Sequence, residues 1–350
     1  MVTSARTIEL IDHDAALERL QMPQGLEAKT VKVAKRPRFT YTNNGFVLTL
    51  NPKASFPLPT ETVLENVLEV AGIPKGLAKK TPEKLIAPLV EYHLGRFDKV
   101  RVISNATGLV GLAPTDKTHP IFSPEKTLEA LQKQFPGVLY QQSLLDDRFN
   151  INLLTITSDQ RHKLEEHLAP GTHSFLPAGG DPFMGGAHIR VNALGLEAPL
   201  IEPYMVRLVC TNGAIHAEYI SGRGDKGYGE GDEIWHWFRD GMTAAVGAIT
   251  PIMNTYSNML GHEIPEGEQR MLAVEGMIRQ TRLPRDMAQA VRDSAIANPP
   301  KTMYDLFNML TEVSTHHTKG FEDQVKYMRR AGEQATPDQM ALYCPTCHRN

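Results

Sequence analysis

The chain has 350 residues, of which 41% are hydrophobic and 22% charged, a composition that excludes wholesale disorder and is typical of a globular protein. Its formal net charge of −3 excludes a protein that is basic over its whole surface, but it is compatible with a local basic groove. Three cysteines are too few for a disulfide framework. The N-terminus lacks the apolar core of a signal peptide, and the longest apolar stretch is too short for a bilayer, so we expect a cytoplasmic protein with no membrane partner.

The N-terminal part of the chain combines a short helix with a basic segment. Residues 1–24 predict a short amphipathic helix, and residues 25–40 form the most basic window of the chain. Set against the single acid Glu27, the cations of this window are Lys29, Lys32, Lys35, Arg36 and Arg38. We therefore expect residues 1–44 to form a basic arm that contacts phosphate groups.

Residues 45–234 predict an α+β domain. Two-residue periodicity and turn signals predict strands over 45–50, 99–103, 108–112, 148–157 and 187–194. A helix is predicted over 61–71, and further helices are expected to begin at Thr81-Pro82-Glu83 and Ser123-Pro124-Glu125. In both sequences a hydroxyl stands at the N-cap and proline at the first helical position. Residues 169–187 contain five glycines and three prolines, which favours an ordered loop or a crossing between domains.

The last third of the chain is predicted to be helical. Helices are expected over 269–280, 285–297 and 302–330, with breaks at Pro284 and at Pro299-Pro300. Thr336-Pro337-Asp338 repeats the capping pattern at the start of a tail, residues 334–350. The expected fold class is α+β: a strand-rich mixed or antiparallel sheet with packed helices in the first two-thirds, and a helical region, 235–333, packed on it.

The most distinctive local sequence surrounds Asn212-Gly213, the preferred pair for a type I′ turn. A hairpin in that register places Cys210 opposite Ile215 and Arg207 opposite Glu218. We interpret it as a structural hairpin with a buried cysteine. A nucleophilic pair of Cys210 with His216 is the alternative, but this register puts the two side chains on opposite faces.

Arg207-Leu-Val-Cys-Thr-Asn-Gly213, followed about ninety residues later by a helix running from Met303 to Glu312, resembles the phage/plasmid-like family called domain of unknown function 932. The resemblance covers about residues 95–330. It carries over no catalytic residue. It implies a mobile genetic element, and because members of that family often accompany genes of DNA replication and recombination, it implies a role in nucleic-acid metabolism.

The glycine-rich stretch 221–233 has two interpretations. It lacks Gly-Lys-Ser/Thr, and three acids at its end, Glu230, Asp232 and Glu233, would repel phosphate, so a flexible surface loop is favoured over a phosphate-binding loop. If it binds a ligand, the most concrete form is a clamp on single-stranded nucleic acid through Arg223, Lys226 and Tyr228.

The C-terminal Cys344-Pro-Thr-Cys347 has the spacing of half a zinc site. The remaining ligands would come from His316 and His317, or from the same two cysteines of a second copy. A frayed tail without metal is the favoured interpretation, and a zinc site is the alternative. Zinc is thus the one cofactor that the sequence suggests, and no His-Glu-x-x-His motif is present.

Further cations lie in the helical third. Five arginines, Arg270, Arg279, Arg282, Arg285 and Arg292, are balanced by five acids within 266–293, which favours an ion-paired surface. Lys319, Lys326 and Arg330 fall near one helical face, and together with the basic 29–38 segment they could line a groove for a phosphate backbone.

The sequence therefore predicts a non-catalytic nucleic-acid-binding protein of a phage or plasmid, acting in the host cytoplasm. Single-stranded DNA binding or annealing in replication or recombination, by a homo-oligomer, is the leading hypothesis. A self-associating structural protein of a phage and a metal-dependent enzyme are the alternatives.

Overall fold

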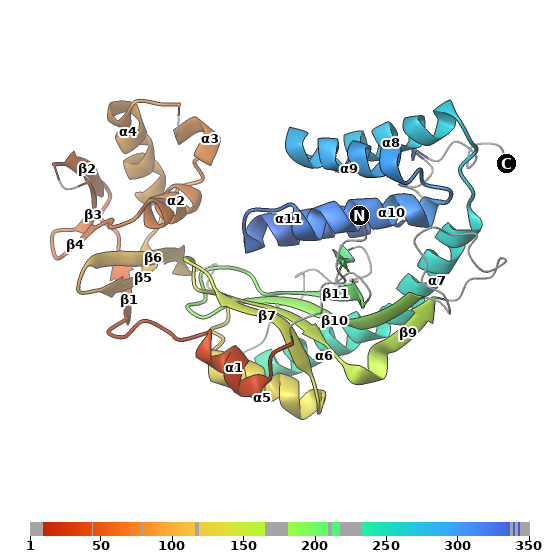
Figure 1. Ribbon diagram of the computed structural model, residues 1–350. Helices are drawn as coiled ribbons and strands as arrows, with labels where there is room; N and C mark the ends of the chain where they lie inside the picture. Colours follow the sequence, from red (N-terminus) through yellow and green to blue (C-terminus); the bar gives the residue numbers. More distant parts are fainter. Residues whose placement is uncertain are drawn as a thin grey trace.

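The computed structural model describes residues 10–43, 45–78, 80–115, 119–164, 181–208, 212–217, 233–336, 339 and 342–343. Separate hydrophobic cores divide these residues into a small lobe, residues 27–114, and a larger body formed by helix α1 and the residues after 119 (Figure 1).

Two three-stranded antiparallel sheets and three helices build the small lobe. Their bounds are β1 Glu27–Lys32, β2 Arg38–Thr42, β3 Gly45–Asn51, β4 Ala54–Pro57, α2 Glu61–Val70, α3 Lys75–Ala78, α4 Glu83–Leu94, β5 Lys99–Asn105 and β6 Gly108–Pro114. The strand orders are β1-β5-β6 and β2-β3-β4. Helix α2 begins where the Thr60 hydroxyl accepts a hydrogen bond from the Val63 amide, and it buries Val63, Val67 and Leu68 in the core of the lobe.

A six-stranded antiparallel sheet forms the centre of the body. Its strands are β7 Leu139–Leu145, β8 Asn150–Ile156, β9 Arg161–Leu164, β10 Asp181–Asn192, β11 Leu200–Arg207 and β12 Gly213–Ile215. The order is β12-β11-β10-β8-β7, and β9 pairs with the first part of β10.

Helices cover both faces of this sheet. They are α1 His13–Glu18, α5 Pro124–Gln134, α6 Glu233–Gly247, α7 Ile249–Gly261, α8 Glu268–Thr281, α9 Arg285–Ala297, α10 Met303–His316 and α11 Phe321–Glu333. One core joins α1, α5 and α6 to one face, whereas α11 packs on the opposite face, and α8 and α9 lie outside α10 and α11 (Figure 1).

The alternation of side chains along β8 and β10 gives the sheet one apolar face and one partly polar face. Ile151 and Leu153 of β8, with Ile189 of β10, enter the core beneath α1, α5 and α6. The residues between them, Asn152 and Arg190, point to the other face, which α11 covers in part. This polar half of the sheet is the floor of the cleft described below.

The α+β fold class predicted from the sequence is confirmed, with antiparallel sheets followed by a helical C-terminal third. The predicted helix 285–297 is α9, residue for residue, and Ser123 caps α5 as expected by accepting from the Lys126 amide. The division of the chain into a basic arm, an α+β domain, a helical region and a tail stays a prediction. Residues 27–32 and 38–42 of the expected arm are strands β1 and β2 of the small lobe.

Three local predictions are wrong, in addition to the loop expected over 169–187, of which residues 181–187 form the first part of β10. The expected helix 302–330 is two helices, because the chain leaves the helix at His317 and re-enters it after Gly320, which is extended. Thr81 does not cap α4: the N-cap is Pro82, and the Thr81 hydroxyl donates to the Leu77 carbonyl.

The third concerns the hairpin of β11 and β12. Tyr204, not Cys210, lies opposite Ile215, and the Arg207 amide donates to the Asn212 carbonyl. Asn212-Gly213 is therefore not the two-residue turn, because Arg207 lies opposite Asn212; Glu218, the predicted partner of Arg207, lies outside the described residues. The absence of a side chain at Gly213 has a packing role instead, because a Cβ there would lie 2.5 Å from the Met328 methyl group and 2.6 Å from the Tyr204 hydroxyl.

Candidate functional site

Seven exposed cations gather on one surface of the small lobe, which we call the basic face. They are Lys32, Lys35, Arg36, Arg38, Lys53, Arg96 and Lys99. Backbone contacts bring their segments together: Val33 N donates to Asp98 O at 2.9 Å, and the Asn51 side chain donates to Lys32 O at 2.6 Å. No ion pair to any of the seven occurs within the described part of the chain, so their charges face solvent.

The basic face reflects an uneven distribution of charge along the chain. Residues 27–114 carry thirteen Lys and Arg against seven Asp and Glu, a formal charge of +6, so the rest of the chain carries −9 of the total of −3. A charge separation of this kind attracts a polyanion to one lobe even though the whole protein is weakly acidic.

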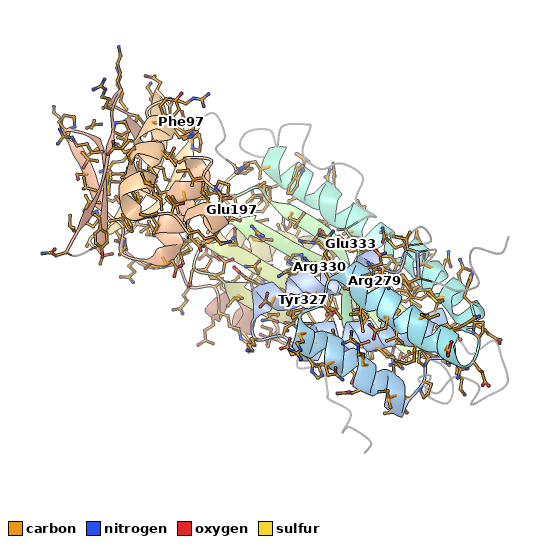
Figure 2. The ribbon with its side chains drawn as sticks, turned by 90° about the horizontal axis from the view of Figure 1, so that it is seen from above. Phe97, Glu197, Arg279, Tyr327, Arg330 and Glu333 are labelled. Atoms are coloured by element: carbon orange, nitrogen blue, oxygen red, sulfur yellow. The ribbon has the colours of Figure 1, made fainter. Side chains whose placement is uncertain are left out.

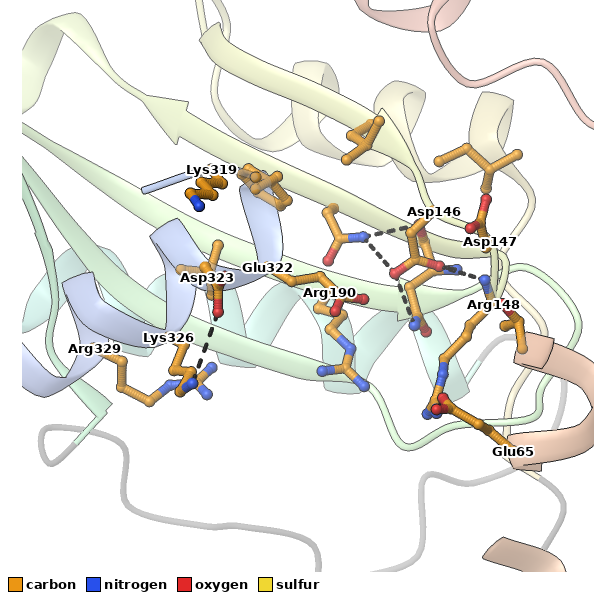
Figure 3. Close-up of a pocket in the computed structure, with 18 residues that line it drawn as sticks. Glu65, Asp146, Asp147, Arg148, Arg190, Lys319, Glu322, Asp323, Lys326 and Arg329 are labelled. Atoms are coloured by element: carbon orange, nitrogen blue, oxygen red, sulfur yellow. Dashed lines mark hydrogen bonds and ion pairs between the residues drawn. The ribbon is translucent and has the colours of Figure 1, made fainter. Parts of the chain in front are cut away.

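A charged cleft of about 960 Å³ lies where the small lobe meets the body (Figure 3). It is bounded by α2, the β7–β8 turn, the polar half of the sheet and the first turns of α11. Its cations are Arg148, Arg190, Lys319, Lys326 and Arg329, and its acids are Glu65, Asp146, Asp147, Glu322 and Asp323. Because the two signs balance, the cleft as a whole has no net preference for an anion.

Asp146 shapes the β7–β8 turn at the edge of this cleft. One carboxylate oxygen accepts from the backbone amides of Arg148 and Asn150, and the other accepts from the side-chain amides of Asn150 and Asn152 at 3.1 Å. With these four hydrogen bonds Asp146 holds the turn, in which Phe149 adopts a positive φ of 62°.

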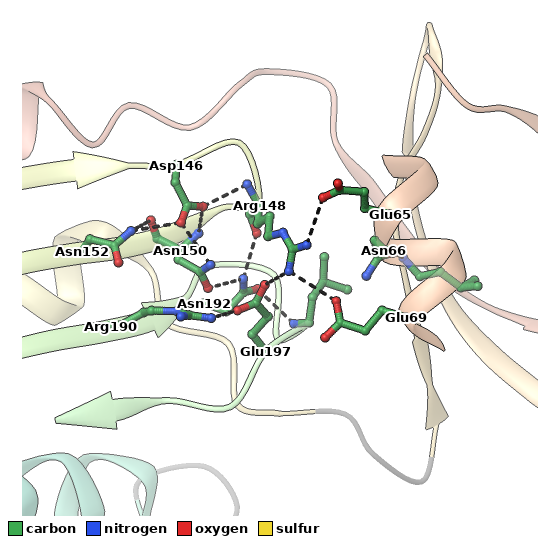
Figure 4. Close-up of polar contacts among 12 residues, drawn as sticks. Glu65, Asn66, Glu69, Asp146, Arg148, Asn150, Asn152, Arg190, Asn192 and Glu197 are labelled. Carbon is green, nitrogen blue, oxygen red and sulfur yellow. Dashed lines mark hydrogen bonds and ion pairs between the residues drawn. The ribbon is translucent and has the colours of Figure 1, made fainter. Parts of the chain in front are cut away.

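Arg148 connects the two lobes (Figure 4). Its guanidinium lies 3.5 Å from Glu65 and 3.3 Å from Glu69, both on α2, and 3.1 Å from Glu197 of the body. Glu197 also pairs with Arg190. One arginine thus bridges carboxylates from both lobes, which makes its ion pairs part of the interface between them.

A buried group of ionisable residues lies beside the cleft. Glu202 is fully buried on β11, where it accepts from His188 Nδ1 and from Arg329 Nε, both at 3.1 Å. Burial disfavours the carboxylate, yet the hydrogen bonds and charges of His188 and Arg329 outweigh it and hold the pKa of Glu202 below its ordinary value. Burial lowers the pKa of His188, so its imidazole is neutral at pH 7.

A second buried network surrounds Arg207. Its Nε donates to Asp181 Oδ2, which also accepts from the Tyr304 hydroxyl at 2.7 Å. Burial raises the pKa of Asp181, against the opposing effect of Arg207 and Tyr304. The partner of Arg207 in this network therefore lies on the neighbouring strand β10, so the sequence around Arg207 does not reveal it.

The structure separates the cations that were expected to share one groove. Lys29, Lys32, Lys35, Arg36 and Arg38 belong to the small lobe, whereas Lys326 and Arg330 lie on α11 in the body (Figure 2). Lys326 lines the cleft, where it is 3.7 Å from Asp323. Arg330 donates to the carbonyl groups of Thr281 and Arg282 at the end of α8.

Several predicted site residues lie outside the described residues. They are Cys210, Glu218, Arg223, Lys226, Tyr228, Cys344 and Cys347. Of the motif that carries the family resemblance, Asn212 Oδ1 accepts a hydrogen bond from His316 Nε2 at 3.1 Å, and the Gly213 amide donates to the Thr315 hydroxyl.

Sequence reasoning missed the cleft, including Arg190, Arg329 and the Asn150–Asn152 pair. The polar alternation in β8 and β10 was a usable signal for the floor, but nothing local indicated that α11 and α2 would close over it.

No protein-family model, curated protein or solved structure matches the chain. Among the residues that the structure describes, no three His, Cys, Asp or Glu side chains are grouped so that they could hold a metal ion. Within the same residues, no helix has the length and apolar character needed to cross a membrane.

Proposed function

We propose that the chain is a non-catalytic protein of a phage or plasmid that binds nucleic acid through the basic face, with single-stranded DNA in replication or recombination as its target. The observation that carries the proposal is the formal charge of +6 on residues 27–114 within a chain of net charge −3, together with the seven solvent-facing cations of the basic face. Lysines and arginines that have no carboxylate partner among the described residues can replace the counterions of a phosphate backbone.

Two further features support a single strand as the ligand. Tyr41 on β2 is 61% exposed and offers an aromatic ring on which a base could stack. The resemblance of the 207–213 and 303–312 segments to a phage/plasmid-like family points to replication and recombination. Lys29 packs over the Phe56 ring at 5.2 Å and keeps its charge at the edge of the same lobe.

The test is a salt titration of binding to fluorescent single- and double-stranded oligonucleotides. The variant Arg36→Ala/Arg38→Ala removes two cations from the basic face. We expect it to weaken single-strand binding about tenfold and to reduce the slope of log K against log salt by about 1.4, since each lost phosphate contact contributes about 0.7.

Lys126→Ala/Lys133→Ala is the matched control, because it removes two exposed lysines from α5 in the body and changes the net charge equally. It should leave both affinity and slope unchanged. Equal weakening by the two variants, or no binding of either oligonucleotide at low salt, would contradict the proposal.

A homo-oligomer is part of the proposal, and a self-associating structural protein is the second candidate function. The observation favouring self-association is a set of large apolar side chains on the surface of both lobes, which includes Leu85, Tyr92, Leu272 and Ile296. Oligomers that form equally well without nucleic acid, in a chain that binds no oligonucleotide, would favour this second candidate.

A further inference from the structure

Helices α3 and α4 of the small lobe present an apolar surface to solvent. Leu77, Leu85, Leu89 and Tyr92 are between 39% and 69% exposed. The spacing of four and three residues from Leu85 to Leu89 and Tyr92 places them on one stripe of α4. Leu77 lies just before the helix, where its carbonyl accepts from the Thr81 hydroxyl. We call these four side chains the α4 surface.

The α4 surface is not the face with which the helix packs in its own lobe. Ile86, Val90 and Leu94 form a separate stripe that is buried in the small-lobe core. Helix α4 therefore has apolar side chains on two sides, and the core accounts for one of them.

A second exposed apolar surface lies on the body. Met271 and Leu272 of α8 and Ile296 of α9 are between 37% and 69% exposed. The two helices pack side by side, and Arg292 pairs with Glu275 across them, so residues near 271 and 296 occupy the same level of the antiparallel pair. We call these three side chains the α8–α9 surface.

The two surfaces carry opposite charges. Lys80, which stands between Leu77 and Leu85, is exposed, and the sequence 75–84 around it has a formal charge of +3. The exposed acids around the α8–α9 surface are Glu263, Glu266, Glu268 and Asp293. The cations among them are Arg270, which pairs with Glu266, and Lys301, which lies beside Glu263, so four acids face two cations. Contact between unlike surfaces is thus favoured over contact between two copies of the same surface, because like charges repel.

We infer that the α4 surface of one copy docks on the α8–α9 surface of a second copy of this chain. The contact gives a structural basis to the self-association within the proposed function, and it requires no nucleic acid. Because the surfaces differ, the contact is head to tail, and each added copy leaves one surface of each kind open until a ring closes or a filament grows. Three or four apolar side chains on each partner are fewer than in a standard interface, so we expect a dissociation constant on the order of micromolar for one contact.

The test uses two variants that each disable one surface. Leu85→Asp/Leu89→Asp alters the α4 surface, and Leu272→Asp/Ile296→Asp alters the α8–α9 surface. In sedimentation velocity without nucleic acid, the wild-type chain should form species that grow with concentration, and each variant alone should be a monomer. An equimolar mixture of the two variants should form a heterodimer and nothing larger, because each brings one intact surface.

The charge reversals Lys80→Glu and Glu268→Lys provide a second readout on exposed positions. Each alone should weaken association at least about tenfold, and the pair in one chain should restore it. Circular dichroism shows whether each variant is folded. A wild-type chain that stays monomeric to about 100 μM, well above the expected dissociation constant, would overturn the inference. So would a mixture of folded variants that stays monomeric, or an α4 variant that still assembles alone.

The test separates this inference from nucleic-acid binding. Loss of assembly in the α4 variant with retained single-strand binding of the monomer supports the docking surfaces. The Arg36→Ala/Arg38→Ala variant should assemble like the wild type, because its substitutions lie on the basic face; failure of that variant to assemble would count against the α4 surface.

Discussion

At the scale of single residues, His188, Glu202 and Arg329 form a buried group whose protonation is coupled to folding. Glu202 accepts hydrogen bonds from His188 and from Arg329, and His188 stays neutral because it is removed from water. The group therefore depends on one particular protonation state, and acid opposes that state.

We expect the free energy of unfolding to fall as the pH drops from 7.5 to 5. The pKa of His188 is lowered in the folded protein, so below about 6.5 the unfolded chain binds a proton that the folded chain does not. Glu202, whose folded pKa is also lowered, adds a further loss as the pH falls through its folded pKa. Urea unfolding at several pH values measures this slope. His188→Gln should flatten it between pH 7.5 and 5.5, and the exposed His236→Gln should not; equal slopes in all three proteins would contradict the assignment.

Arg207 and Asp181 form the other buried pair that a substitution can test. Arg207→Met leaves the fully buried Asp181 carboxylate without its cation, and we expect a loss of about 3–5 kcal/mol in unfolding free energy. Asp181→Asn combined with Arg207→Met should recover part of that loss, because the uncompensated charge is gone. Denaturant unfolding of both variants provides the comparison, and a double variant less stable than Arg207→Met alone would contradict it.

The cysteines at the C-terminus lead to a prediction about metal. A zinc site at the tail predicts that the purified protein carries zinc and that Cys344→Ser/Cys347→Ser removes it, as mass spectrometric metal analysis would measure. Cys210→Ser is the control and should keep the metal. Equal zinc contents in all three proteins would contradict a site at the tail.

Among the secondary-structure elements, α11 packs closely against β12 because Gly332 of the helix has no side chain. A Cβ at Gly332 would lie 2.1 Å from the Ile215 carbonyl oxygen of β12, so the helix and the strand approach closely at that point. On the same helix, Arg329 donates to Glu202 and Lys326 lines the cleft. The packing of α11 against β12 therefore positions one wall of the cleft.

Gly332→Ala should destabilise the protein although alanine favours helices. The clash is with backbone atoms, and overpacking of this kind costs about 1–3 kcal/mol or more. Gly247→Ala in α6 is the matched control, since nothing lies within 4 Å of its Cβ, and it should be neutral or stabilising by about 0.5–1 kcal/mol. Thermal unfolding measures both, and a stabilising Gly332→Ala would show that α11 does not pack as described.

At the scale of the whole molecule, the contact between the two lobes depends on a few polar groups and small apolar contacts. Arg148 bridges Glu65 and Glu69 of α2 to Glu197 of the body, and a Cβ at Gly111 of β6 would meet the Leu196 side chain. The lobes have separate hydrophobic cores, so these contacts largely set how strongly they are coupled.

Arg148→Ala should loosen the small lobe without unfolding it. We expect the free energy of unfolding to fall by about 1–2 kcal/mol, because the ion pairs are partly exposed and screened. Relative to the wild type, hydrogen exchange should become faster in α2 and stay unchanged in α6. Arg239→Ala, which removes an exposed arginine paired with Asp240 on α6, is the control. Unchanged exchange in α2 would mean that the lobes are held together by other contacts.

Features that depend on neighbouring residues were predictable from the amino-acid sequence alone. Helix α9 lies between Pro284 and Pro299-Pro300 as predicted, α5 begins at the Ser123 cap, and the two-residue periodicity of 99–103 and 108–112 is the hairpin of β5 and β6. Caps, proline breaks and periodicity act over a few residues, so they can be read without the fold.

Contacts between residues far apart in the chain became known only from the fold. The register of β11 with β12 differed from the prediction because Gly213 packs against Met328 and Tyr204, and Arg207 found Asp181 on another strand. The polar residues of the cleft floor follow the alternation along β8 and β10, which the sequence shows. The cleft walls are formed by α2 and α11, which lie about 260 residues apart in the chain. Burial, charge pairing and close packing between such segments depend on the whole assembled core. The sequence of a short segment therefore does not predict them.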